Sequence, residues 1–250
     1  MKKLSILAGK SVLWLGDKMH RGSSLPGAVA LKLDSHIMEK IKLPKKIIAV
    51  TGSCGKGSTS KMIAEVYKSL GYKVAHNYRE GNLQYGVLTA LIEYSNLKGE
   101  MDADVLVLEV DERYAKVVFP ILKPQTVVIT NISRDQSPRQ GHFDLVLEDI
   151  KKALNPKMHL ILNADDPYLQ KLVLNNEYKV TYYSLDKTKQ STKTSLCENL
   201  NITHCPKCGK KLEYDYYHFE AIGHYHCTKC YFKNPKSEYI ASKVNYDKRE

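Results

Sequence analysis

The stretch that decides the fold reads Val50-Thr51-Gly52-Ser53-Cys54-Gly55-Lys56-Gly57-Ser58-Thr59-Ser60. An apolar run, 47–50, precedes it, and a segment of helical periodicity, 58–70, follows it. Glycines in such a position turn the backbone tightly and aim N–H groups at a bound anion, and the positive end of the following helix adds to the attraction. The pattern predicts a strand, a polyphosphate-binding loop and a helix. An ordinary strand-to-helix turn is the alternative.

This loop departs from the generic phosphate-binding pattern G-x-x-x-x-G-K-[ST], which needs a hydroxyl where the chain has Gly57. The shorter form T-G-x-x-G-K, which Mur ligases and folylpolyglutamate synthases use, resembles 51–56 directly. We therefore expect Ser58 or Thr59, or a water, to supply the missing ligand of Mg²⁺. Lys56 adds a point charge for phosphate and is a predicted catalytic residue. The predicted nucleotide contacts in the loop are Thr51, Gly52, Ser53, Cys54, Gly55, Lys56, Gly57, Ser58 and Thr59.

Composition is that of a soluble globular protein with one large core, or one core and a small module, since 43% of the 250 residues are apolar and 26% are charged. The net charge of +11 indicates polyanionic partners: nucleotide, an anionic membrane surface, a pyrophosphate-bearing substrate or nucleic acid. A solvated, lysine-rich surface without a single partner is the alternative, because the lysines are spread along the chain.

The N-terminus begins like a signal peptide, but Lys10 interrupts its apolar run and Asp17 follows soon after. No run approaches 18 apolar residues, so we expect no transmembrane segment. Four of the six cysteines form two C-x-x-C pairs, which favours metal binding in a reducing cytoplasm over secreted disulfides. We expect a cytoplasmic protein, with peripheral contact to the inner membrane face as a further expectation.

Apolar strands alternate with amphipathic helices along the chain, which predicts an α/β fold: a mostly parallel sheet with helices on both faces, plus a small zinc ribbon. Strands are expected at 47–50, 72–75, 105–110, 126–130, 158–162 and 178–184. Helices are expected at 28–41, 58–70, 81–92, 117–122, 143–154 and 167–174. In the helix 58–70 the expected buried stripe is Met62, Ile63, Val66, Tyr67 and Leu70, with Gly71 as its C-terminal cap. The predicted division is a helical lead-in at 1–46, an ATP-binding domain at 47–200, a ribbon at 201–235 and a continuation from 236 to 250.

Ligands of parallel sheets sit beyond the carboxyl ends of the strands, and polar residues fall at those ends here: the loop after Val50, 109–112, 131–135 and 163–166. Glu109 ends an apolar strand, where an unpaired acid is costly, so we assign it to Mg²⁺ and to catalysis. A salt bridge to Lys56 or Arg113 is its alternative. The segments after Thr130 and Leu162 suggest base, ribose or substrate contacts, although each also fits an ordinary capping turn.

The second module rests on Cys205-x-x-Cys208 and Cys227-x-x-Cys230, whose spacing presents four thiolates to one tetrahedral Zn²⁺. Two disulfides are the alternative. Nearby histidines at 204, 218, 224 and 226 are expected to stay outside the ligand set, because four cysteines already close a structural site.

A series of motifs resembles the family of Mur-ligase-like subunits of lipid II isoglutaminyl synthases, the MurT family, over most of residues 20–240. The motifs are Leu25-Pro-Gly27, Thr51-Gly-x-x-Gly-Lys56, Glu109-Val-Asp-Glu112, Thr130-Asn-x-x-Arg-Asp-Gln136 and Leu162-Asn-Ala-Asp-Asp-Pro167. The resemblance implies Mg·ATP on the glycine loop, Mg²⁺ on Glu109 and adenine near Asn131 and Asp135. We also predict Ser58 as a Mg²⁺ ligand and Arg134 as a nucleotide contact. An inserted zinc ribbon is itself a trait of this family.

The function implied is an ATP-dependent ligase step of peptidoglycan synthesis. ATP would phosphorylate the α-carboxyl of the D-glutamate in lipid II, and ammonia from a GatD-like glutamine amidotransferase subunit would then form D-isoglutamine. A zinc-ribbon nucleic-acid binder is an alternative that leaves the phosphate loop without a role, so no nucleic acid is expected. A folylpolyglutamate or cyanophycin-type ligase shares the loop but not the cysteine pairs.

The resemblance also implies a third, C-terminal domain that closes over the ATP site and supplies a catalytic aspartate, whereas this chain stops at Glu250. We expect either a fragment or a natural short form. Together with Gly57, this keeps open a truncated or degenerate nucleotide-binding protein without ligase activity, and we expect this chain alone to bind ATP without making isoglutamine.

Overall fold

The structure, a computed structural model, describes residues 1–19, 24–79, 81–133, 143–175, 177–195 and 204–244. Seven described strands form one sheet in the order β2-β3-β1-β4-β5-β6-β9, and every pairing in it is parallel. The strands are β1 Lys46–Thr51, β2 Val74–His76, β3 Val105–Glu109, β4 Thr126–Ile129, β5 His159–Asn163, β6 Lys179–Leu185 and β9 Tyr239–Ala241.

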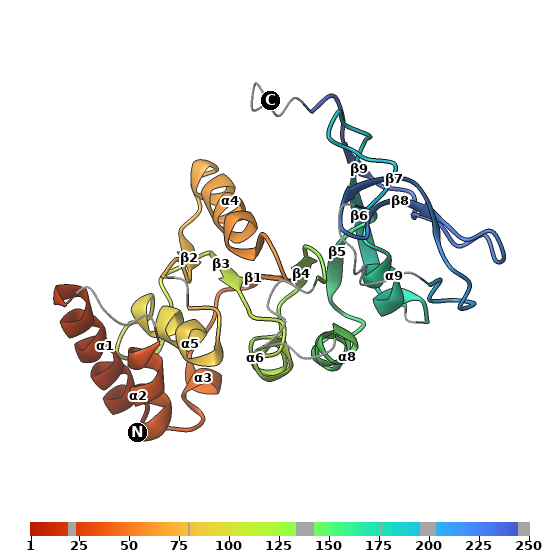
Figure 1. The fold of residues 1–250 in the computed structure, drawn as a ribbon. Helices are drawn as coiled ribbons and strands as arrows, with labels where there is room; N and C mark the ends of the chain where they lie inside the picture. The colour runs from red at the N-terminus through yellow and green to blue at the C-terminus, as the bar shows by residue number, and fades with distance from the viewer. Residues whose placement is uncertain (20–23, 80, 134–142, 176, 196–203, 245–250) are drawn as a thin grey trace.

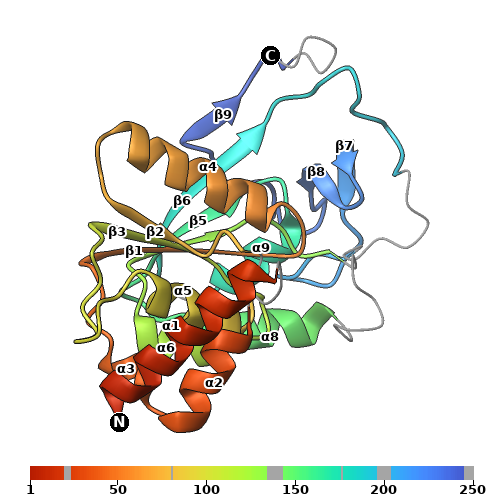
Figure 2. The ribbon, with the colours of Figure 1, turned by 90° about the vertical axis from the view of Figure 1, so that its left-hand side faces the viewer.

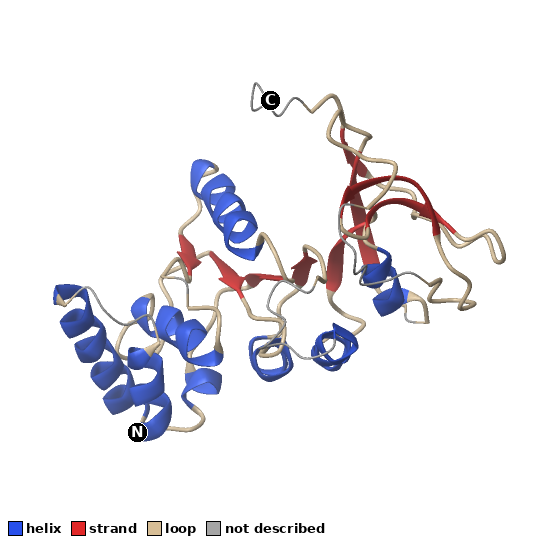
Figure 3. Cartoon of the chain, viewed as in Figure 1, coloured by secondary structure: helices blue, strands red, loops and turns tan. Residues whose placement is uncertain are grey.

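Helices cover both faces of this sheet, but unequally (Figures 1 and 3). The helices are α1 Lys2–Lys18, α2 Leu25–Leu33, α3 Ile37–Lys40, α4 Lys56–Ser69, α5 Gln84–Glu93, α6 Ala115–Leu122, α8 Phe143–Ala153 and α9 Pro167–Val173. Helix α4 lies on one face, while α5, α6 and α8 lie on the other, where α1 and α2 pack beyond α5 (Figure 2). The predicted fold class, a parallel α/β sheet covered on both faces, is confirmed.

Alternation along the strands divides the interior into two cores, because successive side chains of a strand point to opposite faces. In β1, Ile47 and Ala49 join the larger core on the α5, α6 and α8 side, and Ile48 and Val50 join the smaller core under α4. Since β1 is buried on both faces over 47–50, its sequence is a continuous apolar run.

The buried face of α4 differs from the predicted stripe. Ile63 and Tyr67 do pack against the small core, but Met62, Val66 and Leu70 are exposed, and the correct buried positions are Lys56, Ser60 and Ala64. The prediction assigned the largest apolar side chains of the helix to its buried face. Because α4 lies close to the sheet, small side chains such as Ser60 and Ala64 fit there instead. Gly71 follows the helix with φ +85, as expected of a C-terminal cap.

The predicted helix over 28–41 is two helices in the structure. Asp34 adopts an extended conformation at the end of α2, and its carboxylate accepts hydrogen bonds from the His36 N–H and from Lys40 Nζ. Such a side-chain turn competes with helix hydrogen bonds, which explains the break.

Gly27 of the Leu-Pro-Gly motif lies so close to α5 that a Cβ on it would collide with the Tyr85 carbonyl oxygen.

The chain leaves the central sheet after β6 and returns to it. Between these points β7, Glu213–Phe219, and β8, Ile222–His226, form an antiparallel hairpin, and β9 then pairs with β6. The domain boundaries given above remain predictions. Across the described residues, no helix combines the length and the apolar character needed to cross a bilayer.

Candidate nucleotide and metal sites

The loop between β1 and α4 depends on two glycines with positive φ. Gly52 has φ +127 and Gly55 has φ +79, conformations that side-chain-bearing residues rarely adopt. A Cβ on Gly52 would also collide with the Thr130 hydroxyl and lie 2.8 Å from the Asn131 carbonyl oxygen, whereas Gly55 faces open space. Gly52 is therefore required for both conformation and space, and Gly55 for conformation.

Helix α4 starts inside the predicted phosphate loop, at Lys56. Its first backbone hydrogen bond inside the helix runs from the Thr59 N–H to the Gly55 carbonyl, so the N–H groups of 55–58 precede the helical ladder. Four such groups at a helix N-terminus form a positively polarised cradle. This arrangement fits the phosphates of a nucleotide.

Lys56 is buried below this cradle. Its Nζ donates to the Ser53 carbonyl oxygen at 3.0 Å and lies 3.3 Å from Glu112 Oε2. Burial raises the pKa of the Glu112 carboxyl, and the Lys56 ammonium acts in the opposite direction. Among the described residues, Lys56 forms its ion pair with Glu112. The salt bridge between Lys56 and Glu109 that the sequence left open as an alternative is not present in this part of the structure.

The loop after β4 holds the glycine loop from the other side. Asn131 accepts from the Cys54 N–H and donates to the Cys54 carbonyl oxygen, both at 3.0 Å, and its own carbonyl accepts from the Ser53 N–H at 2.9 Å. The Ser53 hydroxyl also bonds the backbone of Ser133. The N–H groups of Ser53 and Cys54 are therefore used within the protein and fix the loop's shape, while their contact with nucleotide stays a prediction.

Glu109 ends β3 beside the N-terminus of α4. Asn82 donates to Glu109 Oε1 at 3.0 Å. The Asn77 side chain donates to the Glu109 carbonyl oxygen and accepts from the Glu109 N–H, both at 2.8 Å. Within the described residues Glu109 forms no ion pair, and Arg113, the other partner considered, contacts Asp111 instead. The carboxylate is half-buried and oriented by neutral amides, which leaves its charge available for a cation.

Gly57 lies directly beside this carboxylate. A Cβ on Gly57 would be 3.1 Å from Glu109 Oε2. A hydroxyl side chain at position 57 would thus occupy the space next to Glu109, where a Mg²⁺ bound to nucleotide phosphates would need ligands. Ser58 lines the same cavity as Glu109, and its role as a Mg²⁺ ligand stays a prediction.

A cavity of about 670 Å³ opens on the β2 side of this position. Its lining includes Ser58, Lys61, His76 and Glu109. His76 is buried, with Nε2 3.1 Å from Ser60 Oγ. Burial, and after it the charge of Lys68, lowers the pKa of His76, while Glu65 acts in the opposite direction. The volume is that of a small-molecule site. Its charged lining is mixed, because Lys61 and Lys68 stand beside Glu65 and Glu109, and Lys68 pairs with Glu65 at 2.8 Å.

The acidic residues after β5 stabilise the loops at the same edge of the sheet, where the strands have their carboxyl ends. Asp166 caps α9 by accepting the Tyr168 N–H, and its other oxygen accepts the Ile132 N–H at 2.9 Å. Burial raises the pKa of Asp166 to about 6, although these N–H groups favour its charged form. Asp166 therefore ties the loop after β5 to the loop after β4.

The predicted convergence of polar residues at one sheet edge is largely realised. The loops after β1, β4 and β5 are joined by the hydrogen bonds given above, and Glu109 lies beside α4. Arg134 and Asp135, the predicted nucleotide contacts, lie outside the described residues. Sequence reasoning missed Asn77 and Asn82 as residues of this site. Asn77 directly follows β2, and Asn82 follows Gly81 a few residues later. Because β2 ends at the same edge of the sheet, these positions were a usable signal.

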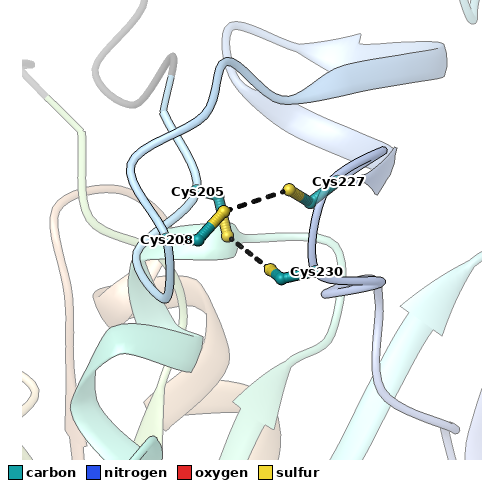
Figure 4. Close-up of side chains that lie close together, drawn as sticks. All are labelled: Cys205, Cys208, Cys227 and Cys230. Atoms are coloured by element: carbon teal, nitrogen blue, oxygen red, sulfur yellow. Dashed lines mark hydrogen bonds between the residues drawn. The ribbon is translucent and has the colours of Figure 1, made fainter.

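The four cysteines of the two C-x-x-C pairs meet at one point (Figure 4). Sγ of Cys205 lies 3.5 Å from that of Cys230, Sγ of Cys208 lies 3.5 Å from that of Cys227, and all four lie within 4.8 Å of one another. A tetrahedron with Zn–S bonds of about 2.3 Å has edges of roughly 3.8 Å. The set therefore fits a zinc ion, and the histidines are not part of this group.

The two cysteine turns have the same backbone design. Gly209 follows the first pair with φ +74, and Tyr231 follows the second with φ +58. In each turn the N–H of this residue donates to the carbonyl of the first cysteine, Cys205 or Cys227. Burial raises the pKa of the Cys205 thiol. Zinc binds cysteine as the thiolate, so metal binding would release the proton of this thiol.

Comparison with known proteins agrees with this geometry. The sequence profile of the Mur ligase middle domain matches residues 50–227, from the end of β1 to the third cysteine of the cluster. The chain belongs to the Mur ligase family. The glycine loop, Glu109 and the parallel sheet are thus the parts of a Mur ligase middle domain, as the sequence resemblance implied.

Among curated proteins, the chain is similar to MurT proteins. Subunit MurT of the lipid II isoglutaminyl synthase (glutamine-hydrolyzing) of Staphylococcus aureus strain COL is 33% identical over 224 residues, which are 89% of this chain and 49% of that protein. The corresponding Streptococcus pneumoniae R6 protein is 30% identical over 96% of this chain and 53% of its own length. The chain spans about half the length of the curated relatives it matches.

Solved Mur ligase structures share the fold. A pseudomurein peptide ligase type C from Methanothermus fervidus superposes with a TM-score of 0.65 and 26% identity, over 84% of this chain and 41% of that one. A MurF ligase from Thermotoga maritima, solved in complex with ADP, gives a TM-score of 0.51 at 19% identity, over 65% and 38%. The second similarity shows the fold alone.

Proposed function

We propose that this chain provides the Mg·ATP-binding part of a MurT-type ligase that amidates lipid II. The observation that carries the proposal is the cradle of N–H groups at 55–58, with Glu109 oriented by Asn82 beside it. The similarity to MurT proteins supports the reaction class.

In the proposed reaction an oxygen of the D-glutamate α-carboxylate takes the γ-phosphoryl group of ATP and ADP leaves. Ammonia from a GatD-like glutaminase subunit then attacks the acyl carbon, releasing phosphate and a proton and leaving D-isoglutamine.

In this proposal the N–H groups of 55–58 would bind the ATP phosphates, and Glu109 would hold Mg²⁺. Both would stabilise the negative charge on the phosphoryl oxygens in the transition state. The cavity beside His76 and Lys61 is the proposed place for the carboxylate of the substrate. A cytoplasmic location follows from this role as part of the proposal.

Calorimetric titration with ATP, with and without Mg²⁺, tests the nucleotide site. Saturable binding that Mg²⁺ strengthens is expected, and Glu109→Gln should remove most of the Mg²⁺ effect while leaving binding of ATP alone. Asp102→Asn is the matched control, because Asp102 is an exposed acid that pairs with Lys73 and lies before β3, at the other end of that strand. Absence of saturable binding would reject the proposal.

Gly57 favours a second candidate, a Mur-ligase-like nucleotide-binding protein without ligase activity, because position 57, whose Cβ would lie 3.1 Å from Glu109 Oε2, carries no hydroxyl. The two candidates differ in whether amidated lipid II forms when lipid II, ATP, Mg²⁺, glutamine and a GatD-type glutaminase are supplied, followed by mass spectrometry. Amidation supports the ligase; ATP binding without amidation supports the second candidate. Gly57→Ser should strengthen Mg·ATP binding under both.

The cysteine cluster is proposed to hold one structural Zn²⁺. Its role in the proposed enzyme is to fold the segment between β6 and β9, because four thiolates leave no open position for chemistry. Metal analysis of the purified protein is expected to give one equivalent of zinc. A value clearly below one would reject this assignment.

A further inference from the structure

Helix α1 uses only one side to pack against the molecule. Ile6, Gly9 and Leu13 are buried where α1 contacts α2 and α5. In Figure 2 the helix crosses the front of the molecule, on the side away from the sheet. Its other side carries large apolar side chains in solvent. Their exposed fractions are 56% for Leu4, 49% for Leu7, 58% for Trp14 and 51% for Leu15.

The exposed apolar side chains are two pairs, Leu4 with Leu7 and Trp14 with Leu15. Positions 4, 7, 11, 14 or 15, and 18 follow one another at intervals of three or four, which places them on one side of an α-helix. Ser11 lies between the two pairs, and Lys18 ends the stripe. Lys10, Ser11, Trp14 and Leu15 line a shallow hollow on it of about 350 Å³. An exposed leucine alone needs no explanation, but a stripe over four turns marks an interaction surface.

The charges around the stripe are almost all positive. Helix α1 contains four lysines and a single acid, Asp17, which is paired with Arg79. Lys18 Nζ lies 3.9 Å from the centre of the Trp14 ring, so a cation and an aromatic ring share the stripe. Lys3 is exposed on its border, whereas Lys10, one heptad along, turns its Nζ to the Glu93 carbonyl oxygen at 3.1 Å.

We propose that α1 is a membrane-surface helix that docks the protein on anionic lipid. Apolar side chains at the centre of the stripe would enter the boundary between headgroups and acyl chains, and the lysines would meet lipid phosphates. Tryptophan and lysine, each with an apolar body and a polar tip, suit that boundary. The surplus of lysine favours an anionic bilayer over an apolar protein groove. The inference rests on α1 alone and does not depend on ligase activity.

Trp14 is the only tryptophan of the chain, so its fluorescence reports on α1 directly. The full chain is mixed with vesicles of phosphatidylcholine, with and without phosphatidylglycerol. Sedimentation with the anionic vesicles and a blue shift of Trp14 emission are expected, with much weaker binding to neutral vesicles. Lys3→Gln and Lys18→Gln should each weaken binding about fivefold. Leu4→Ser/Leu7→Ser should remove most of it.

The matched control is Met62→Ser/Val66→Ser, which changes two comparably exposed apolar residues on α4 and should bind vesicles like the wild type. Thermal melts of every variant confirm folding. The proposal is overturned if the protein does not bind anionic vesicles, if Leu4→Ser/Leu7→Ser binds unchanged, or if the protein sediments without a change in Trp14 emission. A dimer that the α1 variant dissociates, without vesicle binding, would also overturn it in favour of a protein contact.

Discussion

At the scale of single residues, the glycines of the loop between β1 and α4 have different tasks, and substitutions should separate them. Gly55→Ala is expected to cost about 1–2 kcal/mol of unfolding free energy, because alanine must adopt a positive φ there. Gly52→Ala should cost more, roughly 2–4 kcal/mol, because its Cβ also meets Thr130 and Asn131. Urea unfolding measures both.

Gly71→Ala is the matched control for this pair. Gly71 has φ +85 and open space around it, like Gly55, but it follows α4 at the end away from the loop. It should lose similar stability and keep its affinity for ATP, whereas Gly55→Ala should lose both. Equal ATP affinities in the two variants would show that the loop conformation is not needed for binding.

The buried His76 should make stability depend on pH. Burial lowers its pKa from the ordinary 6.5, so the unfolded chain binds a proton at a higher pH than the folded protein does. The unfolding free energy should therefore fall as the pH drops below about 6.5, where the unfolded histidine starts to be protonated. His76→Gln keeps a polar partner for Ser60 and should show a shallower fall between pH 7 and 5 in chemical denaturation. An unchanged slope would mean that His76 is protonated equally in both states.

At the scale of elements, the cysteine ribbon has too small a core to fold without its metal. Its buried residues are Cys205, Leu212, Tyr225 and Cys227. A strong chelator should therefore unfold the β7–β8 hairpin, seen as loss of the near-ultraviolet tyrosine signal, while the far-ultraviolet signal of the larger sheet persists.

Cysteine variants give the matched comparison for this prediction. Cys208→Ser should lose zinc and show the apo spectrum, whereas Cys54→Ser, which changes the cysteine of the glycine loop, should retain one equivalent. Zinc retained by Cys208→Ser together with an unchanged spectrum would exclude a four-thiolate site.

Element positions were well predicted from the sequence, and α4 shows where such prediction stops. Its helical period is clear, but a period alone does not say which side meets the sheet. Ser60 and Ala64 face inward because the helix approaches β1 and β3 closely, while Met62 and Val66 remain in solvent. That choice depends on a distance between elements, which a local pattern does not contain.

At the scale of the whole molecule, Asn234 couples the ribbon to the central sheet. Its amide donates to the Ala164 carbonyl oxygen and to Asp165 Oδ1, and its oxygen accepts the Tyr225 N–H. Asn234→Ala should cost about 2–4 kcal/mol, since several partly buried hydrogen bonds are lost together. Zinc release and far-ultraviolet circular dichroism, followed in one denaturant titration, should coincide in the wild type and separate in the variant. Coincident transitions in both would contradict this coupling.

The sequence by itself determined the parallel α/β sheet, the glycine loop and the cysteine set, because strand and helix periods, glycine turns and C-x-x-C spacing are local properties of the chain. Only the tertiary structure decided that Glu112 and not Glu109 pairs with Lys56, that Asn77 and Asn82 orient Glu109, and that β9 closes the sheet beyond the ribbon. These contacts join residues distant in sequence, and they form only when the strand order sets which chain ends become neighbours.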